Sequence, residues 1–190
     1  MKYGELNLGQ IEAIVNKLGG MAGVQRFLAG ECTVAPKEPP TLPKPRIERT
    51  FKLTLDYSMA PADMLRATKC DYIYQWMLEH CPGLKGTGRV EVTANLIDMG
   101  GYWTRNESLA AIDALGLVRT PDNAALWTLS KDHPDLQCEI WVVDPETVWQ
   151  DENGNPCVTC LGGRPGERSA RLDRVESRWV RRNLVLALSK

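Results

Sequence analysis

The chain is poor in histidine and phenylalanine, with two of each in 190 residues, and its formal net charge is only −1. The near balance of charges excludes the strongly basic composition of a protein that coats nucleic acid. Long apolar runs are also missing, because the longest stretch without a charged residue, 153–163, is rich in Gly, Asn and Pro. A membrane-spanning helix needs ~20 apolar residues. The first residues lack an apolar run and a cleavage-type ending, so we expect no signal peptide, no membrane partner and a cytoplasmic location.

Cysteine is more frequent, with six in the chain, an even count that would fit disulfides in a secreted protein. Cytoplasmic thiols stay reduced, so we expect free thiols that behave as small apolar side chains. Cys157 and Cys160 form the only CxxC motif and are weak metal candidates, since a zinc site needs more ligands and only His80 and Cys81 suggest a second pair. The motif lies between strand-like stretches, which argues against a thioredoxin-type role. We therefore expect no metal and no cofactor.

Residues 7–30 have the pattern of two short amphipathic helices. Ile11, Ile14, Val15 and Leu18 recur at helical spacing, and the pair Gly19-Gly20 ends the first helix. Helices this short are not stable alone, because nucleation is costly. They must therefore dock on the main domain, on a partner protein, or on each other in a homodimer.

Residues 35–46 contain five prolines in twelve positions. Proline at this density removes backbone donors and favours extended chain, so the segment is predicted to be a semi-rigid linker. It divides the sequence into a helical N-terminal module, 1–34, and a main domain, 47–190.

The main domain mixes helical and strand patterns. Alternation predicts strands near 51–55 and 90–98, and an apolar run predicts a last strand at 183–188. Thr104 and Glu107 have the spacing of a capping box and predict a helix that Gly116 ends. The other elements expected are helices over 61–68 and from 120–122 to 133, strands at 140–143, 147–150 and 157–161, and an ambiguous helix or strand within 166–182. The fold class predicted is α+β.

Most of the chain, and the first thirty residues most strongly, resembles a group of uncharacterised bacterial and phage proteins. The residues that carry the resemblance are Gln10–Met21, Gly23-Val24, Arg26–Leu28, Leu53–Ser58 and Thr147–Gln150. No established function comes with this resemblance.

The second half, from about residue 88, resembles the C-type-lectin-like fold of formylglycine-generating-enzyme relatives and of retroelement target proteins. The matching segments are 110–115, 116–121 and 124–129, followed by Trp179 and the stretch 183–189. The resemblance implies an antiparallel sheet that presents a binding face. The catalytic cysteines of the enzyme branch cannot be placed on Cys157 and Cys160, so copper-oxidase chemistry is not implied.

Charge is distributed unevenly along the main domain. Residues 101–160 carry three basic and ten acidic side chains, whereas 161–190 carry eight basic and three acidic ones. Arginine offers bidentate geometry to carboxylates and phosphates, so the basic cluster is a candidate surface for an acidic protein or for nucleic acid. The alternative is that it lies against the acidic part of its own domain. With the aromatic residues next to predicted loops, the candidate binding residues are Arg171, Arg174, Arg178, Trp179, Arg181, Arg182, Tyr102 and Trp103.

No catalytic constellation is recognisable in the sequence. It has no Ser-His-Asp arrangement, no zinc-protease motif and no Gly-rich loop that opens a helix, as a nucleotide site requires. The sequence therefore favours a non-enzymatic binding module for a protein or other macromolecule. The alternative is an inhibitor, encoded by a phage or mobile element, of a host machine that handles nucleic acid.

Overall fold

The computed structural model describes residues 7–31 and 44–190 except Arg181. The chain divides into two compact units, 1–41 and 42–190. Most of the predicted linker, 35–46, lies outside the described residues. Its last residue, Arg46, is already the first residue of a strand.

The first unit contains the predicted helix pair. Helix α1 (Leu8–Lys17) begins with a capping box in which Asn7 and Gln10 bond each other's backbone N–H. Helix α2 (Met21–Leu28) follows Gly19 and Gly20, whose positive φ angles make the turn. A Cβ on Gly23 would lie 1.5 Å from the Leu18 carbonyl oxygen, so only glycine permits this close approach. The prediction of two helices is confirmed.

The second unit is an α+β domain, as predicted. Its elements, in chain order, are β1 (Arg46–Asp56), α3 (Pro61–Ala67), β2 (Tyr72–Ile73), α4 (Gln75–Glu79), β3 (Arg89–Asp98), α5 (Arg105–Ala114), α6 (Ala124–Asp132), α7 (Leu136–Glu139), β4 (Trp141–Gln150), β5 (Pro156–Arg164), β6 (Glu167–Arg174) and β7 (Asn183–Leu188).

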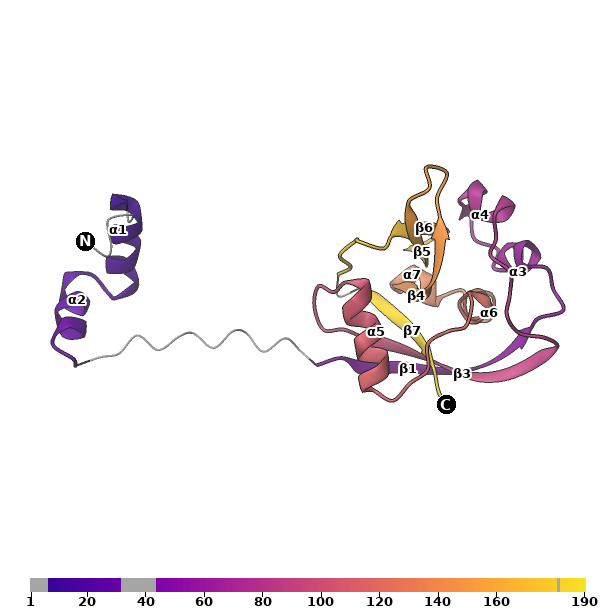
Figure 1. The fold of residues 1–190 in the computed structure, drawn as a ribbon, viewed down its shortest axis with the longest axis horizontal. Coiled ribbons are helices and arrows are strands. Elements are labelled where there is room, and N and C mark those ends of the chain that lie inside the picture. Colours follow the sequence, from indigo (N-terminus) through magenta and orange to yellow (C-terminus); the bar gives the residue numbers. More distant parts are fainter. Residues whose placement is uncertain (1–6, 32–43, 181) are drawn as a thin grey trace. The chain divides into compact units, whose positions relative to one another are not determined.

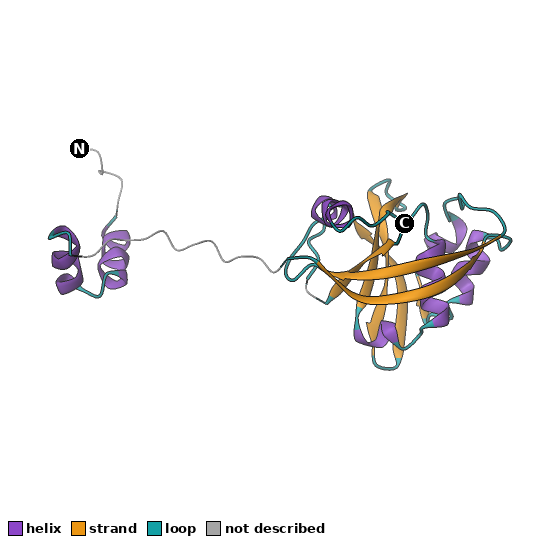
Figure 2. Ribbon diagram, turned by 90° about the horizontal axis from the view of Figure 1, so that it is seen from below, coloured by secondary structure: helices purple, strands orange, loops and turns teal. Residues whose placement is uncertain are grey.

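The seven strands form one sheet in the order β1-β3-β7-β4-β5-β6-β2. Strand β7 lies in the middle and joins an antiparallel β1–β3 ribbon to an antiparallel β4–β5–β6 meander. Strands β1 and β3 are long and curve across the domain (Figure 2). The β4–β7 and β2–β6 pairs are parallel, so the sheet is mixed, whereas the lectin-like resemblance implied an antiparallel one.

Both faces of the sheet are buried in separate hydrophobic clusters. In β7, Leu184, Leu186 and Leu188 belong to one cluster, and Val185 and Ala187 belong to the other. The first, here called the large core, receives side chains from α3, α4, α6 and α7, and the second, the small core, from α5. Figure 1 shows α3, α4 and α6 near one another, with α5 apart from them. This two-sided burial explains why the last strand is a continuous apolar run.

Several element boundaries differ from the sequence prediction. The two strands expected at 140–143 and 147–150 are one strand, β4, with a register shift between Asp144 and Val148. Helix α6 begins at Ala124 rather than at 120–122, because the side chain of Asp122 accepts a bond from the Ala124 N–H. The ambiguous stretch contains a strand, β6, followed by a turn. The short elements β2, α4 and α7 were not predicted, and the capping box at Thr104 is confirmed.

A buried polar network joins the start of α6 to the centre of the sheet. Asn123 donates to the Asp144 carboxylate at 2.8 Å, and its Oδ1 accepts from the indole N–H of Trp149 at 2.8 Å and from the Thr159 hydroxyl at 3.2 Å. Asp144 also accepts from the Thr120 hydroxyl at 2.5 Å. Burial raises the pKa of the Asp144 carboxyl to about 6.

No helix among the described residues is long and apolar enough to cross a bilayer.

Candidate functional site

The predicted arginine cluster does not form a single patch. Arg171 and Arg174 are three residues apart in β6, and side chains alternate along a strand, so they point to opposite faces of the sheet. Arg171 pairs with Cys160, which faces the small core, and Arg174 pairs with Cys157, which faces the large core. Arg174 lies in the field of Asp151, whose pKa is lowered by hydrogen bonds from Asn155 and further by the arginine charge.

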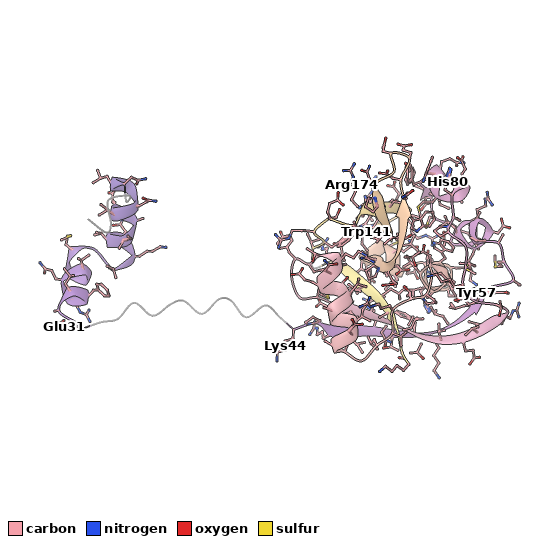
Figure 3. All side chains as sticks on the ribbon, in the orientation of Figure 1. Glu31, Lys44, Tyr57, His80, Trp141 and Arg174 are labelled. Carbon is pink, nitrogen blue, oxygen red and sulfur yellow. The ribbon has the colours of Figure 1, made fainter. Side chains whose placement is uncertain are left out.

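On the side of the small core, Arg171 stacks on a tryptophan. Its guanidinium carbon lies 3.9 Å from the centre of the Trp141 ring. Trp141 begins β4 and is half-buried, and 48% of the Arg171 side chain remains exposed. Figure 3 shows the position of Trp141 among the strands. The stack holds the guanidinium in a fixed plane at the surface, where it can accept an external anion.

Gly162 makes this arrangement possible. It lies in β5, next to the residue that pairs with Val142, and the Trp141 ring covers it. A Cβ on Gly162 would lie 2.3 Å from the ring. Glycine inside a strand often marks such a close approach of another group.

Asp173 connects the stack to its neighbours. One carboxylate oxygen lies 3.6 Å from Nε of Arg171. The other accepts from the Trp179 indole N–H at 3.2 Å and from the Cys160 thiol at 3.4 Å. Arg171 is only partly neutralised, because its 3.6 Å ion pair with Asp173 is longer than a hydrogen bond and lies at a partly exposed position.

Trp103 is buried, which corrects the expectation that it is an exposed contact, and the candidate binding residue Trp179 is buried as well. Their exposed fractions are 1% and 3%, and their rings stack with centres 4.7 Å apart. The two residues also exchange backbone hydrogen bonds of 3.0 and 2.9 Å. This bridge turns both indoles into the small core. The sequence pattern failed because residues next to a loop can pair with a distant segment.

Tyr102 and Arg178 flank this bridge, and both are exposed, as predicted. The Tyr102 side chain is 68% exposed, and the guanidinium carbon of Arg178 lies 5.9 Å from its ring centre. Asp173 links this pair to the other one, because it lies beside Arg171 and accepts from Trp179, the neighbour of Arg178. We call the two pairs, Arg171 with Trp141 and Arg178 with Tyr102, the arginine–aromatic surface. Arginine, tryptophan and tyrosine are the residue types most enriched at binding hot spots.

Of the remaining candidates, Arg182 is exposed and borders an open groove shared with Arg46, Asp98 and Glu139. Its backbone carbonyl accepts from the Trp141 N–H at 3.1 Å. Arg181 lies outside the described residues.

Cys157 and Cys160 cannot hold one metal ion together. They point into the large and the small core respectively, on opposite faces of β5. Burial raises the pKa of both thiols. Among the described residues, no group of three or more His, Cys, Asp or Glu side chains is arranged to hold a metal ion.

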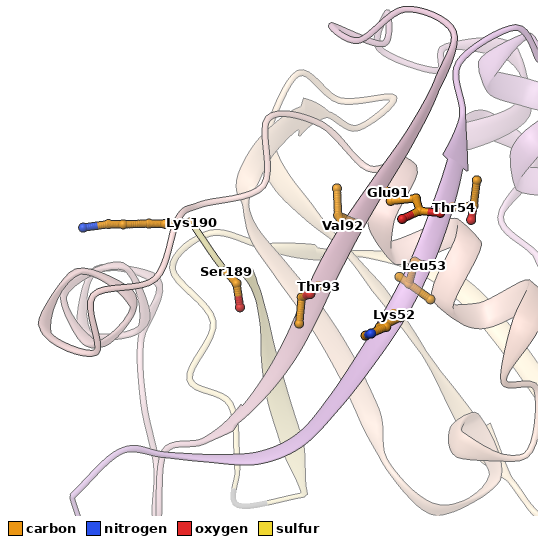
Figure 4. A pocket seen from close by; sticks show the side chains of 8 residues that line it. All are labelled: Lys52, Leu53, Thr54, Glu91, Val92, Thr93, Ser189 and Lys190. Carbon is orange, nitrogen blue, oxygen red and sulfur yellow. The ribbon is translucent and has the colours of Figure 1, made fainter.

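A second hollow lies on the outer face of the β1–β3 ribbon (Figure 4). It is an open groove of about 460 Å³. Its lining residues are Lys52, Leu53 and Thr54 of β1, Glu91, Val92 and Thr93 of β3, and Ser189 and Lys190 after β7. Its mixed charges and small hydroxyls do not converge on one point, so it carries no specific chemistry.

No family model matches this chain, and searches of curated proteins and of solved structures found no match either. The lectin-like resemblance therefore stays an expectation, and function must be argued from the surface itself.

Sequence reasoning missed Trp141. Trp141 directly precedes the apolar pair Val142-Val143 in a predicted strand, a pattern that is typical of a core residue. The doublet Gly162-Gly163, directly after the predicted strand 157–161, was the available signal, because a strand with no side chain at one position leaves room for a neighbouring ring.

We expect Gly162→Ala to displace the Trp141 ring and to destabilise the domain by about 1–3 kcal/mol, the usual cost of overpacking. The measurements are the melting temperature and the indole ¹⁵N–¹H signal of Trp141, assigned with Trp141→Phe. Gly83→Ala is the matched control, because a Cβ there meets nothing within 4 Å. An unchanged Trp141 signal in Gly162→Ala would show that the ring does not depend on this glycine.

Proposed function

We propose that this chain is a non-enzymatic binding module in which the domain 42–190 recognises a protein partner through the arginine–aromatic surface. The observation that carries the proposal is the stack of Arg171 on Trp141 over Gly162. An exposed arginine ordinarily moves freely and loses entropy when it binds. Here the ring and Asp173 already fix its direction, so less ordering is needed on binding.

The chemistry of the surface favours a protein segment that carries acidic side chains and can also pack against aromatic rings. The planar guanidinium groups of Arg171 and Arg178 suit carboxylates, and the rings of Trp141 and Tyr102 supply apolar contact area. Nucleic acid is less favoured, because its binding depends on many positive charges acting together. Asp173 partly offsets Arg171, and Arg174 points to the other face of the sheet.

The test compares partner capture by the full chain and by the double variant Arg171→Glu/Arg178→Glu. Arg89→Glu is the control, because that arginine also lies beside an aspartate, Asp56, and has a 76% exposed side chain, but belongs to β3 and stacks on no aromatic ring among the described contacts. Proteins captured from the cells that express the chain are quantified by mass spectrometry, with and without nuclease.

We expect a protein that binds the wild type and Arg89→Glu and is lost with the double variant. If Arg171 is a hot spot, affinity measured with the purified partner should fall about 30-fold, equivalent to ~2 kcal/mol. Melting temperatures should not change, because exposed charges contribute little to stability. If nuclease abolishes capture, the surface binds nucleic acid and the proposal of a protein partner is wrong. Equal capture by the double variant would contradict the proposal.

A further inference from the structure

Asp144 is a carboxylate that solvent does not reach. Its exposed fraction is 0%, and it lies in β4, at the point where the pairing with β5 shifts register between Asp144 and Val148. Burial disfavours the charged form of a carboxyl group unless a nearby cation or strong hydrogen bonds compensate for the lost water. The groups that face Asp144 therefore determine how readily it holds a proton.

The groups that donate hydrogen bonds to Asp144 are all neutral. One carboxylate oxygen accepts from the Thr120 hydroxyl at 2.5 Å and from the Glu146 backbone N–H at 3.1 Å. The other accepts from the Asn123 side-chain amide at 2.8 Å. A hydroxyl can accept as well as donate, so the Thr120 contact can be kept when Asp144 carries a proton. The site therefore accommodates both the ionised and the protonated carboxyl group.

No cation among the described residues bonds to Asp144. Strand β7 contains no charged residue, and the one charged residue of β5 is Arg164, which ends the strand and pairs with Glu167. The charged groups of the other elements around β4 are bonded elsewhere: Arg105 to the Pro145 carbonyl, Glu107 to Thr104, Arg119 to Asp113 and Glu146, Asp122 to the backbone N–H groups of Lys85 and Ala124, and Lys131 to Asp132. No ion pair therefore balances the negative charge of an ionised Asp144.

The buried position of Asp144 makes the folded domain bind a proton there more tightly than the unfolded chain does. The lost hydration outweighs the hydrogen bonds and raises the pKa of Asp144 to about 6. In the unfolded chain the group titrates near its ordinary pKa of about 4. The stabilisation that follows is complete below about pH 4 and is lost as the pH rises through about 6.

The segment 117–123, which precedes α6, is attached to the sheet partly through this carboxylate. Its residues Thr120 and Asn123 bond Asp144, and Val118 exchanges backbone hydrogen bonds of 2.8 Å with Leu188. Because Asp144 is fully buried, water reaches the ionised group only when a segment that covers it loosens. The segment held by the bonds of Asp144 itself is 117–123.

We propose that Asp144 is a pH-sensitive switch: when it holds a proton, the segment 117–123 and the start of α6 are bound firmly to β4, and when it loses the proton near neutral pH, this attachment weakens. The two states are the protonated and the ionised carboxyl group in one hydrogen-bond network. The switch uses no residue of the arginine–aromatic surface, so it is independent of what that surface binds.

The test is urea unfolding of the full chain at pH 5 and at pH 7, followed by tryptophan fluorescence. Asp144→Asn keeps the shape of the side chain but does not titrate. The matched control is Asp98→Asn, which changes another buried aspartate, 5% exposed, in β3 of the same sheet. Between the two pH values, the equilibrium constant for unfolding should rise roughly tenfold more in the wild type and in Asp98→Asn than in Asp144→Asn.

Two measurements on the wild type test the switch even if Asp144→Asn does not fold. In a titration followed by side-chain carboxyl ¹³C signals, we expect Asp144 to have a midpoint near pH 6. The amides of 118–124 should be less protected from hydrogen exchange, relative to the unfolded chain, at pH 7 than at pH 5. An Asp144 midpoint near pH 4 overturns the proposal. So does equal protection of these amides at both pH values, or a pH dependence of unfolding that Asp144→Asn retains in full.

Discussion

Replacing Asn123 with alanine should destabilise the domain by roughly 3–5 kcal/mol, a large fraction of the usual stability of a domain. The side-chain amide of Asn123 forms hydrogen bonds with three buried groups: the Asp144 carboxylate, the Trp149 indole N–H and the Thr159 hydroxyl. Alanine removes all three bonds. Each buried polar group without a partner costs about 1–3 kcal/mol.

The measurement is urea unfolding followed by fluorescence, with Asn106→Ala as the control. Asn106 is exposed in the first turn of α5, so the same chemical change there should alter the unfolding free energy by less than about 0.5 kcal/mol. For a domain of this size, Asn123→Ala should lower the melting temperature by roughly 10 °C. A loss below 1 kcal/mol would mean that the network is not the link between α6 and the sheet.

Trp179→Ala should destabilise the domain by about 3–5 kcal/mol, as expected for a large aromatic side chain removed from a core. The indole stacks on Trp103 and donates to Asp173, so its loss leaves a cavity in the small core and removes one donor from Asp173. Trp179→Phe keeps most of the ring volume and should cost less. The comparison is made by thermal unfolding of both variants.

Arg178→Ala separates packing from binding at the neighbouring position. Arg178 is exposed, so the melting temperature of the Arg178→Ala variant should stay within about 1 °C of the wild-type value. The opposite outcome would be a Trp179→Ala variant that keeps the melting temperature of the wild type but no longer captures the partner. In that case Trp179 contacts the partner directly and is not buried in solution.

The predictions from sequence succeeded where local patterns determine local structure. The capping box at Thr104, the alternation in 51–55 and the two N-terminal helices were read correctly, because each depends on residues within a few positions of one another. The class α+β follows from such elements together. Their pairing does not, since the order of strands depends on contacts between distant segments.

The binding residues were predicted less well for the same reason. Arg171 and Arg174 are close in sequence and were therefore predicted to form one cluster. In β6, successive side chains alternate between the two faces of the sheet, so these two arginines lie on opposite faces. Trp103 and Trp179 are separated by 75 intervening residues and become buried only because their backbones pair. Trp141 became a candidate once the register placed it over Gly162. Register is a property of the whole sheet, which a local pattern does not contain.

The central position of β7 affects how the chain can fold during synthesis. The β1–β3 ribbon and the β4–β5–β6 meander meet only through this strand, which is later in sequence than all the others. While residues 183–188 are still inside the ribosome, one edge of β3 and one edge of β4 have unpaired backbone N–H and C=O groups, and both cores stay open on one side. The nascent domain must therefore complete its fold after those residues emerge. Until then it exposes two unpaired strand edges, which can pair with other chains and which a chaperone could protect.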